Sequence, residues 1–178
     1  MIKMIAAVSI NGVIGVNNDI PWMGKYPDDM AFFRAMTKDS IVVMGRKTFE
    51  SMGNRPLPKR ENRIVSASMN VSPPKSDGVC IWHPTLKEAV DAPQGTYKDI
   101  WLIGGEGIYT EGLQYADEIY TTLIPERVDI AGKTCARFPY VHPLEFDCEK
   151  RMMSELVPAA DKQKLVVAIY RPSKTVWH

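Results

Sequence analysis

The segment IVVMGRKTF, residues 41–49, passes from an apolar run to charged and helix-forming residues within a short stretch. The run Ile41–Met44 predicts a buried strand, and Gly45 marks its end. A helix is expected over Lys47–Met52. A strand that turns through one glycine into a helix is typical of an α/β fold, in which helical crossovers join the strands of a mostly parallel sheet.

The same alternation continues in both directions along the chain. Apolar runs predict six buried strands, over Ile2–Ser9, Ile41–Met44, Arg63–Ser66, Val79–Trp82, Ile100–Ile103 and Glu118–Ile124. Turn and capping signals predict four helices, over Asp28–Thr37, Lys47–Met52, Leu86–Asp91 and Glu106–Tyr115. Two further runs, Glu145–Met153 and Lys164–Arg171, are separated by a polar loop with no helix, as in an antiparallel hairpin. We expect a mixed, mostly parallel eight-stranded sheet with flanking helices and a C-terminal hairpin.

Length and composition favour one domain. The chain has 178 residues, of which 45% are hydrophobic, and this is enough to bury one ordinary core. The Pro-rich pieces Arg55–Pro58 and Val71–Pro74 are too short for domain linkers and are expected to be ordered surface connections. The net charge is +1 and the cations are spread along the chain, so nucleic acid is not an expected partner.

The cysteines favour a reducing compartment. Cys80, Cys135 and Cys148 are odd in number, far apart, and lack the short paired spacing of a zinc site or a disulfide framework. The apolar start Met1–Val8 could be mistaken for a signal segment, but a polar Asn11-Gly12 turn interrupts it and no small-residue cleavage site follows. We expect a cytoplasmic protein that acts as a monomer and has no membrane partner.

Two strand-to-helix switches could bind phosphate. At Gly45, backbone N–H groups, Arg46, Lys47 and the Thr48 hydroxyl would suit an anion, although a glycine turn followed by two solvated cations is an equal interpretation. The second switch, Leu102–Tyr109, contains adjacent glycines that let backbone approach a cofactor closely, or that merely permit a tight turn. It is not a G-x-G-x-x-G fingerprint, but two such switches together suggest a dinucleotide laid across the strand ends.

The segment Tyr26–Arg34 places carboxylates at the start of a helix. Asp29 and Phe33 lie four apart on one face, with Met30 and Met36 nearby on the apolar side. A buried carboxylate needs a partner, and a ligand with an amidine-like pair of N–H donors, such as a pterin, would supply a bidentate one. From the helix alone, simple capping of its positive end by Asp28 and Asp29 is the favoured interpretation.

Metal and histidine catalysis find little support in the sequence. His83, His142 and His178 are scattered and are not paired with cysteine or acid at ligand spacing, and no nucleophile elbow is present. We therefore expect chemistry carried by a cofactor and no metal.

In their order along the chain, these pieces resemble dihydrofolate reductase over essentially the whole length. The matching runs are Ile5-Ala6-Ala7, Gly12-Val13-Ile14-Gly15, Pro21-Trp22, Asp29–Arg34, Met44-Gly45-Arg46-Lys47-Thr48, Arg55-Pro56-Leu57-Pro58, Arg60, Asn62, Ile103-Gly104-Gly105, Tyr109 and Thr122. The ordered set is far more specific than any one run, since single motifs of this kind recur by chance.

The resemblance implies a role for each matching position. Asp29 would hold the pterin and favour protonation at its N5 through a water that Trp22 helps to place. Arg60 would pair with the glutamyl carboxylate, and Thr122 would support the acid. The substrate pocket would be formed by Ile5, Ala7, Asp29, Met30, Phe33, Met52, Leu57, Arg60, Ile103 and Thr122, with Met30, Met52 and Leu57 expected to be core residues.

By the same resemblance the hydride donor is NADPH. Arg46 and Ser66 resemble contacts to the 2'-phosphate, and Lys47 and Thr48 lie near the pyrophosphate. The full set of implied cofactor contacts is Ala7, Ile14, Ile20, Gly45, Arg46, Lys47, Thr48, Ser66, Gly104, Gly105, Glu106, Gly107, Ile108 and Tyr109.

The sequence departs from the family pattern at two places. The segment Met23–Asp28 is two residues longer than in the short bacterial members, so Asp28 competes with Asp29; we choose Asp29 because the family's four-residue spacing from acid to aromatic then reaches Phe33. The family's Gly-Asp-Thr is here Gly132-Lys133-Thr134, in a longer segment, which leaves the coupling of loop closure to product release open.

The activity that the resemblance implies is NADPH-dependent reduction of 7,8-dihydrofolate to tetrahydrofolate, in support of one-carbon and thymidylate metabolism, with antifolate inhibitors as further ligands. One alternative is an NADPH-dependent pyrimidine reductase of riboflavin synthesis, which would not be expected to show Trp22, Asp29 and Arg60 together. Another is a non-catalytic nucleotide-binding protein of the same fold, toward which only Lys133 points.

Overall fold

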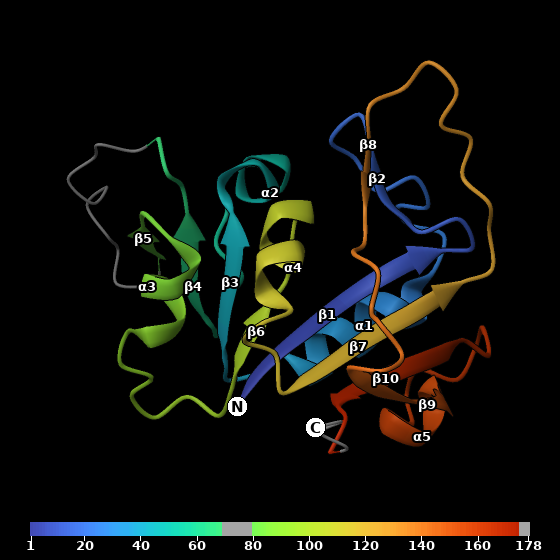
Figure 1. Cartoon of the computed structure of the whole chain (residues 1–178). Helices are drawn as coiled ribbons and strands as arrows, with labels where there is room; N and C mark the ends of the chain where they lie inside the picture. Colours follow the sequence, from blue (N-terminus) through green and yellow to red (C-terminus); the bar gives the residue numbers. More distant parts are fainter. Residues whose placement is uncertain (69–79, 175–178) are drawn as a thin grey trace.

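The computed structural model describes residues 1–68 and 80–174. The predicted surface connection Val71–Pro74, the first residue of the predicted strand Val79–Trp82, and His178 lie outside these residues. Within them, eight strands form one sheet in the order β5-β4-β3-β6-β1-β7-β10-β9, and β2 and β8 form a small second sheet (Figure 1).

The main sheet is mixed, as predicted. Its strands are β1 (Ile2–Ser9), β3 (Ile41–Gly45), β4 (Glu61–Val65), β5 (Cys80–His83), β6 (Ile100–Leu102), β7 (Glu118–Ile124), β9 (Phe146–Met152) and β10 (Val166–Pro172). Pairing is parallel from β5 through to β7, whereas β10 runs antiparallel to both β7 and β9. The predicted fold class and C-terminal hairpin are therefore confirmed.

Helices cover both faces of this sheet. They are α1 (Pro27–Met36), α2 (Arg46–Ser51), α3 (Leu86–Asp91), α4 (Glu106–Gly112) and α5 (Met153–Leu156). In Figure 1, α4 lies in front of β6 and α1 lies behind β1 and β7. Among the described residues, no helix is both long and apolar enough to cross a membrane.

The alternation of side chains along each strand divides the core into two layers. Met4 and Ala6 of β1 point to the layer that α3 and α4 cover, whereas Ile5 points to the layer that contains Phe32 of α1. In β3, Val43 likewise belongs to the first layer, and Val42 and Met44 belong to the second. The buried central strands are apolar on both faces because helices cover both sides.

Two of the predicted elements are wrong in part. The helix expected over Glu106–Tyr115 ends at Gly112, where the Tyr115 N–H donates to the Gly112 carbonyl at 3.0 Å and closes a turn. Gly112 packs directly on β6, since an added Cβ would lie 2.4 Å from Leu102 Cδ1. The loop expected to be free of helix before β10 contains the short helix α5.

Two strands were not predicted. β2 (Val13–Val16) and β8 (Cys135–Arg137) pair with each other in antiparallel fashion. Each is very short, and their pairing joins residues more than a hundred positions apart, which local periodicity cannot reveal.

Candidate active site

The two strand-to-helix switches lie side by side, because β3 and β6 are parallel neighbours. The Gly45 N–H donates to the Gly104 carbonyl at 2.8 Å, and the peptide bond between Gly104 and Gly105 is cis. A Cβ added to Gly105 would lie 3.3 Å from Thr48 Oγ1, and one added to Gly45 would lie 3.6 Å from Ile108 Cγ1. The glycines thus let the first turns of α2 and α4 approach each other closely.

Charged and hydroxyl groups border these glycines. Arg46 and Lys47 in the first turn of α2 are exposed, and Arg46 Nε lies 3.7 Å from Glu50 Oε1. Ser66 is buried just beyond β4, where its N–H donates to the His83 carbonyl at 3.0 Å. Since β4 is the neighbour of β3, the structure brings the switch at Gly45 and the end of β4 to the same edge of the sheet.

Tyr109 connects the second switch to β1. Its hydroxyl donates to the Ile5 carbonyl at 2.8 Å, and its ring contacts that of Phe138 with a centroid distance of 5.0 Å. Because Tyr109 is buried, its ring is held in place next to Gly104. Glu106 and Gly107 of the same helix are exposed, as is Ile20 in the segment after β2, whereas Ile14 is partly buried.

Asp28 and Asp29 have different environments. The Asp28 side chain is buried, and its Oδ2 accepts a hydrogen bond of 2.6 Å from the Gln163 N–H. Asp29 and Thr122 interact across the gap between α1 and β7: burial raises the pKa of Asp29, and the Thr122 hydroxyl opposes this by favouring the ionised form. Neither aspartate caps α1 with its side chain, because the N-cap residue is Tyr26.

Thr122 has an incomplete hydrogen-bond environment. Its Oγ1 is buried and has no partner within 3.5 Å among the described residues, so its influence on Asp29 acts over a longer distance than a formed hydrogen bond. Ala7 lies opposite Thr122 in the parallel pairing of β1 and β7. The end of this strand pair therefore carries a buried hydroxyl with spare hydrogen-bonding capacity.

Five apolar side chains of the implied pocket lie on one side of the sheet. The implied pocket residues Ile5, Phe33, Met52, Leu57 and Ile103 belong to or pack against the core layer on the α1 side of the sheet. Ile5 is fully in the core and the other four are half-buried. Trp22, in the segment that leads to α1, is 5% exposed.

Met30 was expected to be a core residue, and this is wrong. Its side chain is 40% exposed, because α1 turns Asp28 and Phe32 toward the sheet and leaves Met30 on its outer side. Met52 and Leu57 do pack against the core.

Arg60 is a buried cation that makes no ion pair with a carboxylate in the part of the chain that the structure describes. Its Nε donates to Thr37 Oγ1 at 2.9 Å, Nη1 to the Pro58 carbonyl at 2.7 Å, and Nη2 to the Arg34 carbonyl at 3.0 Å. These bonds use three of the five N–H groups of a guanidinium, and one N–H remains on each terminal nitrogen. No carboxylate oxygen of the described residues lies within 4.0 Å, so Arg60 has two N–H groups left to donate to an anion.

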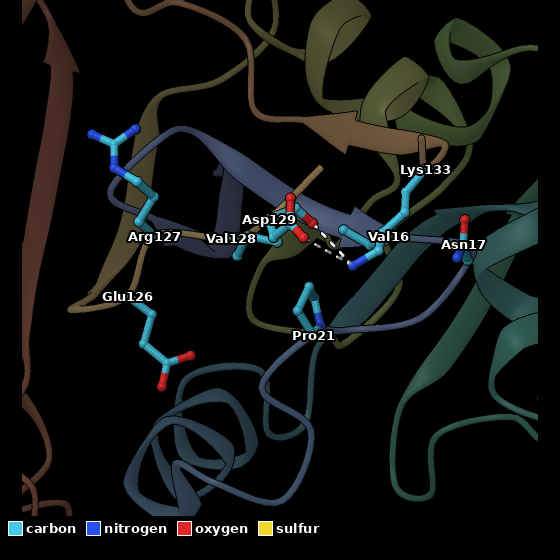
Figure 2. Close-up of a pocket in the computed structure, with 8 residues that line it drawn as sticks. All are labelled: Val16, Asn17, Pro21, Glu126, Arg127, Val128, Asp129 and Lys133. Carbon is cyan, nitrogen blue, oxygen red and sulfur yellow. Dashed lines mark hydrogen bonds and ion pairs between the residues drawn. The ribbon is translucent and has the colours of Figure 1, made fainter. Parts of the chain in front are cut away.

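The loop after β2 is bound to the segment before β8. The Asn17 N–H donates to the Thr134 carbonyl at 2.8 Å, and the Thr134 N–H donates to Asn17 Oδ1 at 3.3 Å. Lys133, which stands where the expected pattern has an acid, reaches back to the Asp129 carbonyl and carboxylate at 3.4 and 3.7 Å (Figure 2). The two segments line an open pocket of about 410 Å³.

Comparison with known proteins identifies the family. The family model described as dihydrofolate reductase matches residues 1–170. A dihydrofolate reductase of Haemophilus influenzae is 39% identical over 147 residues, which cover 83% of this chain and 84% of the relative. The chain belongs to the dihydrofolate reductase family.

Further dihydrofolate reductases agree with this assignment. One from Bacillus subtilis is 40% identical over 124 residues, which cover 70% of this chain and 69% of the relative. A structure of dihydrofolate reductase from Enterococcus faecalis in complex with NADP(H) and RAB-propyl shares the fold, with a TM-score of 0.77, 22% identity, and coverage of 98% of this chain and 97% of that one. The chain is thus an NADPH-dependent oxidoreductase of the dihydrofolate reductase family.

No sequence pattern singles out Gln163 as a site residue. It is a polar residue in a loop, and its partner Asp28 lies 135 positions away along the chain. A second missed residue is Glu126, whose carboxylate accepts a hydrogen bond from the Tyr26 hydroxyl at 3.0 Å and pairs with Lys25. Both contacts hold the segment that leads into α1, which we expect to be longer here than in the short bacterial members of the family.

Proposed function

We propose that this protein reduces 7,8-dihydrofolate to 5,6,7,8-tetrahydrofolate with NADPH, and so supports one-carbon and thymidylate metabolism. The observation that carries the proposal is the environment of Asp29, a carboxyl group whose pKa is raised by burial and which interacts with the buried Thr122 hydroxyl, on a helix that packs against the apolar core layer. A carboxyl group of this kind can hold an amidine-like pair of donors and assist proton transfer near neutral pH.

The backbone at the two switches fits the implied cofactor. A side chain at Gly45 or Gly105 would fill the space beside the first turns of α2 and α4, so glycine keeps backbone N–H groups accessible to pyrophosphate. Arg46 and Lys47 are exposed next to these groups, and Arg46 and Ser66 would contact the 2'-phosphate. When bound, NADPH supplies the hydride from C4 of its nicotinamide ring.

The protein's own groups would orient the pterin and exclude water. Asp29 would accept two hydrogen bonds from the pterin and favour protonation at N5 through a water molecule, with Trp22 helping to place that water. Ile5, Phe33 and Ile103 would pack against the ligand, and their apolar character would keep bulk water away from the reacting carbon. Thr122 would use its spare hydrogen-bonding capacity to support Asp29 or the ligand.

Arg60 would bind the glutamyl end of the substrate. Its three existing hydrogen bonds fix the guanidinium plane, and its two remaining N–H groups match a carboxylate. Antifolate inhibitors that carry the same amidine-like donors would compete for Asp29, because they would present the same pair of N–H groups to the carboxylate.

We further propose that residues 1–178 act as one monomeric domain in the cytoplasm. The large exposed apolar side chains Ile10, Met23, Tyr140 and Leu144 come from three segments of the chain, and the segment between β8 and β9 carries both Tyr140 and Leu144. Light scattering on the purified protein should give a mass near the 20.0 kDa of one chain. A mass that corresponds to a dimer at micromolar concentration would contradict the monomer.

The experiment that tests the function follows NADPH oxidation by the purified protein after dihydrofolate is added, with NADH as a second donor. Rapid turnover with NADPH and much slower turnover with NADH supports both reaction and donor. Oxidation with a ribosylated pyrimidine and not with dihydrofolate would favour the pyrimidine reductase instead. Ligand binding without any oxidation would leave a non-catalytic nucleotide-binding protein.

A further inference from the structure

The first turn of α1 is held by a residue from the other end of the chain. Tyr26 occupies the N-cap position without a side-chain hydrogen bond, and Pro27 follows at the first helical position. In place of a local cap, the side-chain oxygen of Gln163 accepts a hydrogen bond of 3.1 Å from the Asp28 N–H. The start of α1 is thereby capped from outside the helix.

Gln163 makes two more bonds to the same segment. Its Nε2 donates to the Lys25 carbonyl at 2.8 Å, and its backbone N–H donates to Asp28 Oδ2 at 2.6 Å. Both polar atoms of its side-chain amide are thus bonded to residues at the start of α1 or just before it. We call Gln163 and Asp28, with their reciprocal bonds, the α1 clamp.

The loop that carries Gln163 is anchored by buried residues and backbone hydrogen bonds. Gln163 lies between α5 and β10, close to the buried residues Ala160 and Leu165. The Ala160 N–H donates to the Val157 carbonyl at 2.9 Å, and the Leu165 carbonyl accepts from the Met153 N–H at 2.9 Å. A loop anchored in this way holds Lys25 and Asp28, which Gln163 binds, in a fixed position relative to the sheet.

The clamp also sets the rotation of α1. Asp28 and Phe32 are one turn apart, and both are buried on the inner side of the helix, with Phe32 0% exposed. Asp29 and Phe33 are each rotated by one residue, about 100°, onto the neighbouring face. Fixing Asp28 and Phe32 therefore fixes the direction in which the Asp29 carboxyl group points.

We propose that Gln163 and Asp28 are positioning residues for Asp29: the α1 clamp holds the first turn of α1 in the place and rotation at which Asp29 faces Thr122. This inference rests on the proposed function, in which Asp29 contacts the pterin. Neither clamp residue touches the reacting atoms.

The test compares Gln163→Ala with the wild-type protein. The variant loses both side-chain bonds, so the acid is less well placed, and kcat for dihydrofolate reduction should fall by roughly tenfold to a hundredfold. The pH profile of kcat should shift toward lower pH, because a loosened first turn admits water to Asp29 and reduces the desolvation that raises its pKa. The affinity for NADPH should stay within about twofold of the wild type. Gln163 precedes β10, and in the sheet β1 and β7 lie between β10 and the strands β3 and β6 that lead to Gly45 and Gly104.

A second pair of variants separates positioning from simple loss of stability. Asp28→Asn keeps a side-chain oxygen for the Gln163 N–H and should recover most of the activity that Asp28→Ala loses. Gln114→Ala is the matched control, because Gln114 donates a single exposed bond to the Glu111 carbonyl at the end of α4. It should leave kcat and its pH profile unchanged.

The outcomes distinguish this inference from the proposed function. If Gln163→Ala lowers the unfolding midpoint but leaves kcat and the pH profile as in the wild type, the clamp is only structural and the inference is wrong. If Gln163→Ala does not fold, the comparison of Asp28→Asn with Asp28→Ala decides, and equal pH profiles in the two would overturn the inference. If Asp29→Asn itself retains full activity, it is the proposed function that fails.

Discussion

Replacement of Gly104 by alanine should strongly destabilise the protein. Gly104 has φ +115°, a region that residues with a side chain rarely adopt. An added Cβ would lie 3.1 Å from Tyr109 Cε2 and 3.2 Å from its hydroxyl oxygen. The Tyr109 ring cannot move aside easily, because it is buried and its hydroxyl is bonded to the Ile5 carbonyl.

The size of the effect follows from these two contributions. An alanine held in a glycine-only backbone region costs about 1–3 kcal/mol. Forcing an extra methyl group against a packed ring costs about 1–3 kcal/mol more. Together they cost about 2–6 kcal/mol, and with a urea dependence of about 2 kcal/mol per molar the unfolding midpoint should fall by about 1–3 M.

Urea unfolding followed by circular dichroism measures this difference, and Gly107→Ala is the matched control. Gly107 lies in α4, has no atom within 4 Å of a built Cβ, and has no positive φ. Alanine there should stabilise the helix by up to about 1 kcal/mol. Equal midpoints for the two variants would mean that neither the Tyr109 ring nor the backbone at Gly104 resists an added methyl group.

Three further predictions concern charge. Arg46→Gln should reduce the preference for NADPH over NADH by about tenfold to a hundredfold, as expected for one charge-assisted contact of about 1.5–3 kcal/mol, and an unchanged ratio of kcat/KM for the two donors would exclude the contact. Arg60→Met should raise the KM for dihydrofolate at least tenfold with little change in kcat. It should also lower the stability of the protein, because it leaves Thr37 Oγ1 without its donor. A fall in kcat alone would contradict the role of Arg60 in binding the substrate carboxylate. Because the pKa of Asp29 is raised on folding, the wild type loses stability as the pH rises through that pKa, so Asp29→Asn should be the more stable protein at neutral pH and lose this advantage in acid. Thermal unfolding across this range checks the sign, and a variant less stable at neutral pH would reverse it.

The sequence predicts the elements with strong local patterns most accurately. The strands Ile2–Ser9 and Glu118–Ile124 and the helix Leu86–Asp91 have the predicted bounds, because each is a periodic run with clear turn signals at its ends. The end of α4 was misjudged because the contact of Gly112 with Leu102 is tertiary and leaves no local signal. The small sheet of β2 and β8 was missed for the same reason, since its pairing depends on two distant loops.

The features of the candidate site also differ in whether local sequence or tertiary contact determines them. Both glycine switches are visible locally, and the structure places them side by side through the pairing of β3 with β6. The choice between Asp28 and Asp29 depended on spacing, whereas the structure separates them by their partners, Gln163 for Asp28 and Thr122 for Asp29. No periodicity could have indicated Gln163, because a polar loop residue that binds distant backbone looks like any solvated glutamine.

Asp29 is proposed as the acid that holds the pterin and promotes its protonation, and the rate of dihydrofolate reduction by Asp29→Asn as a function of pH tests this role. The variant should be slower than the wild type by about two to four orders of magnitude at neutral pH, and its rate should recover in part as the pH falls and solvent protonates the substrate. A rate at neutral pH that equals that of the wild type, or a pH-dependent loss seen in Asp28→Asn but not in Asp29→Asn, would contradict the account.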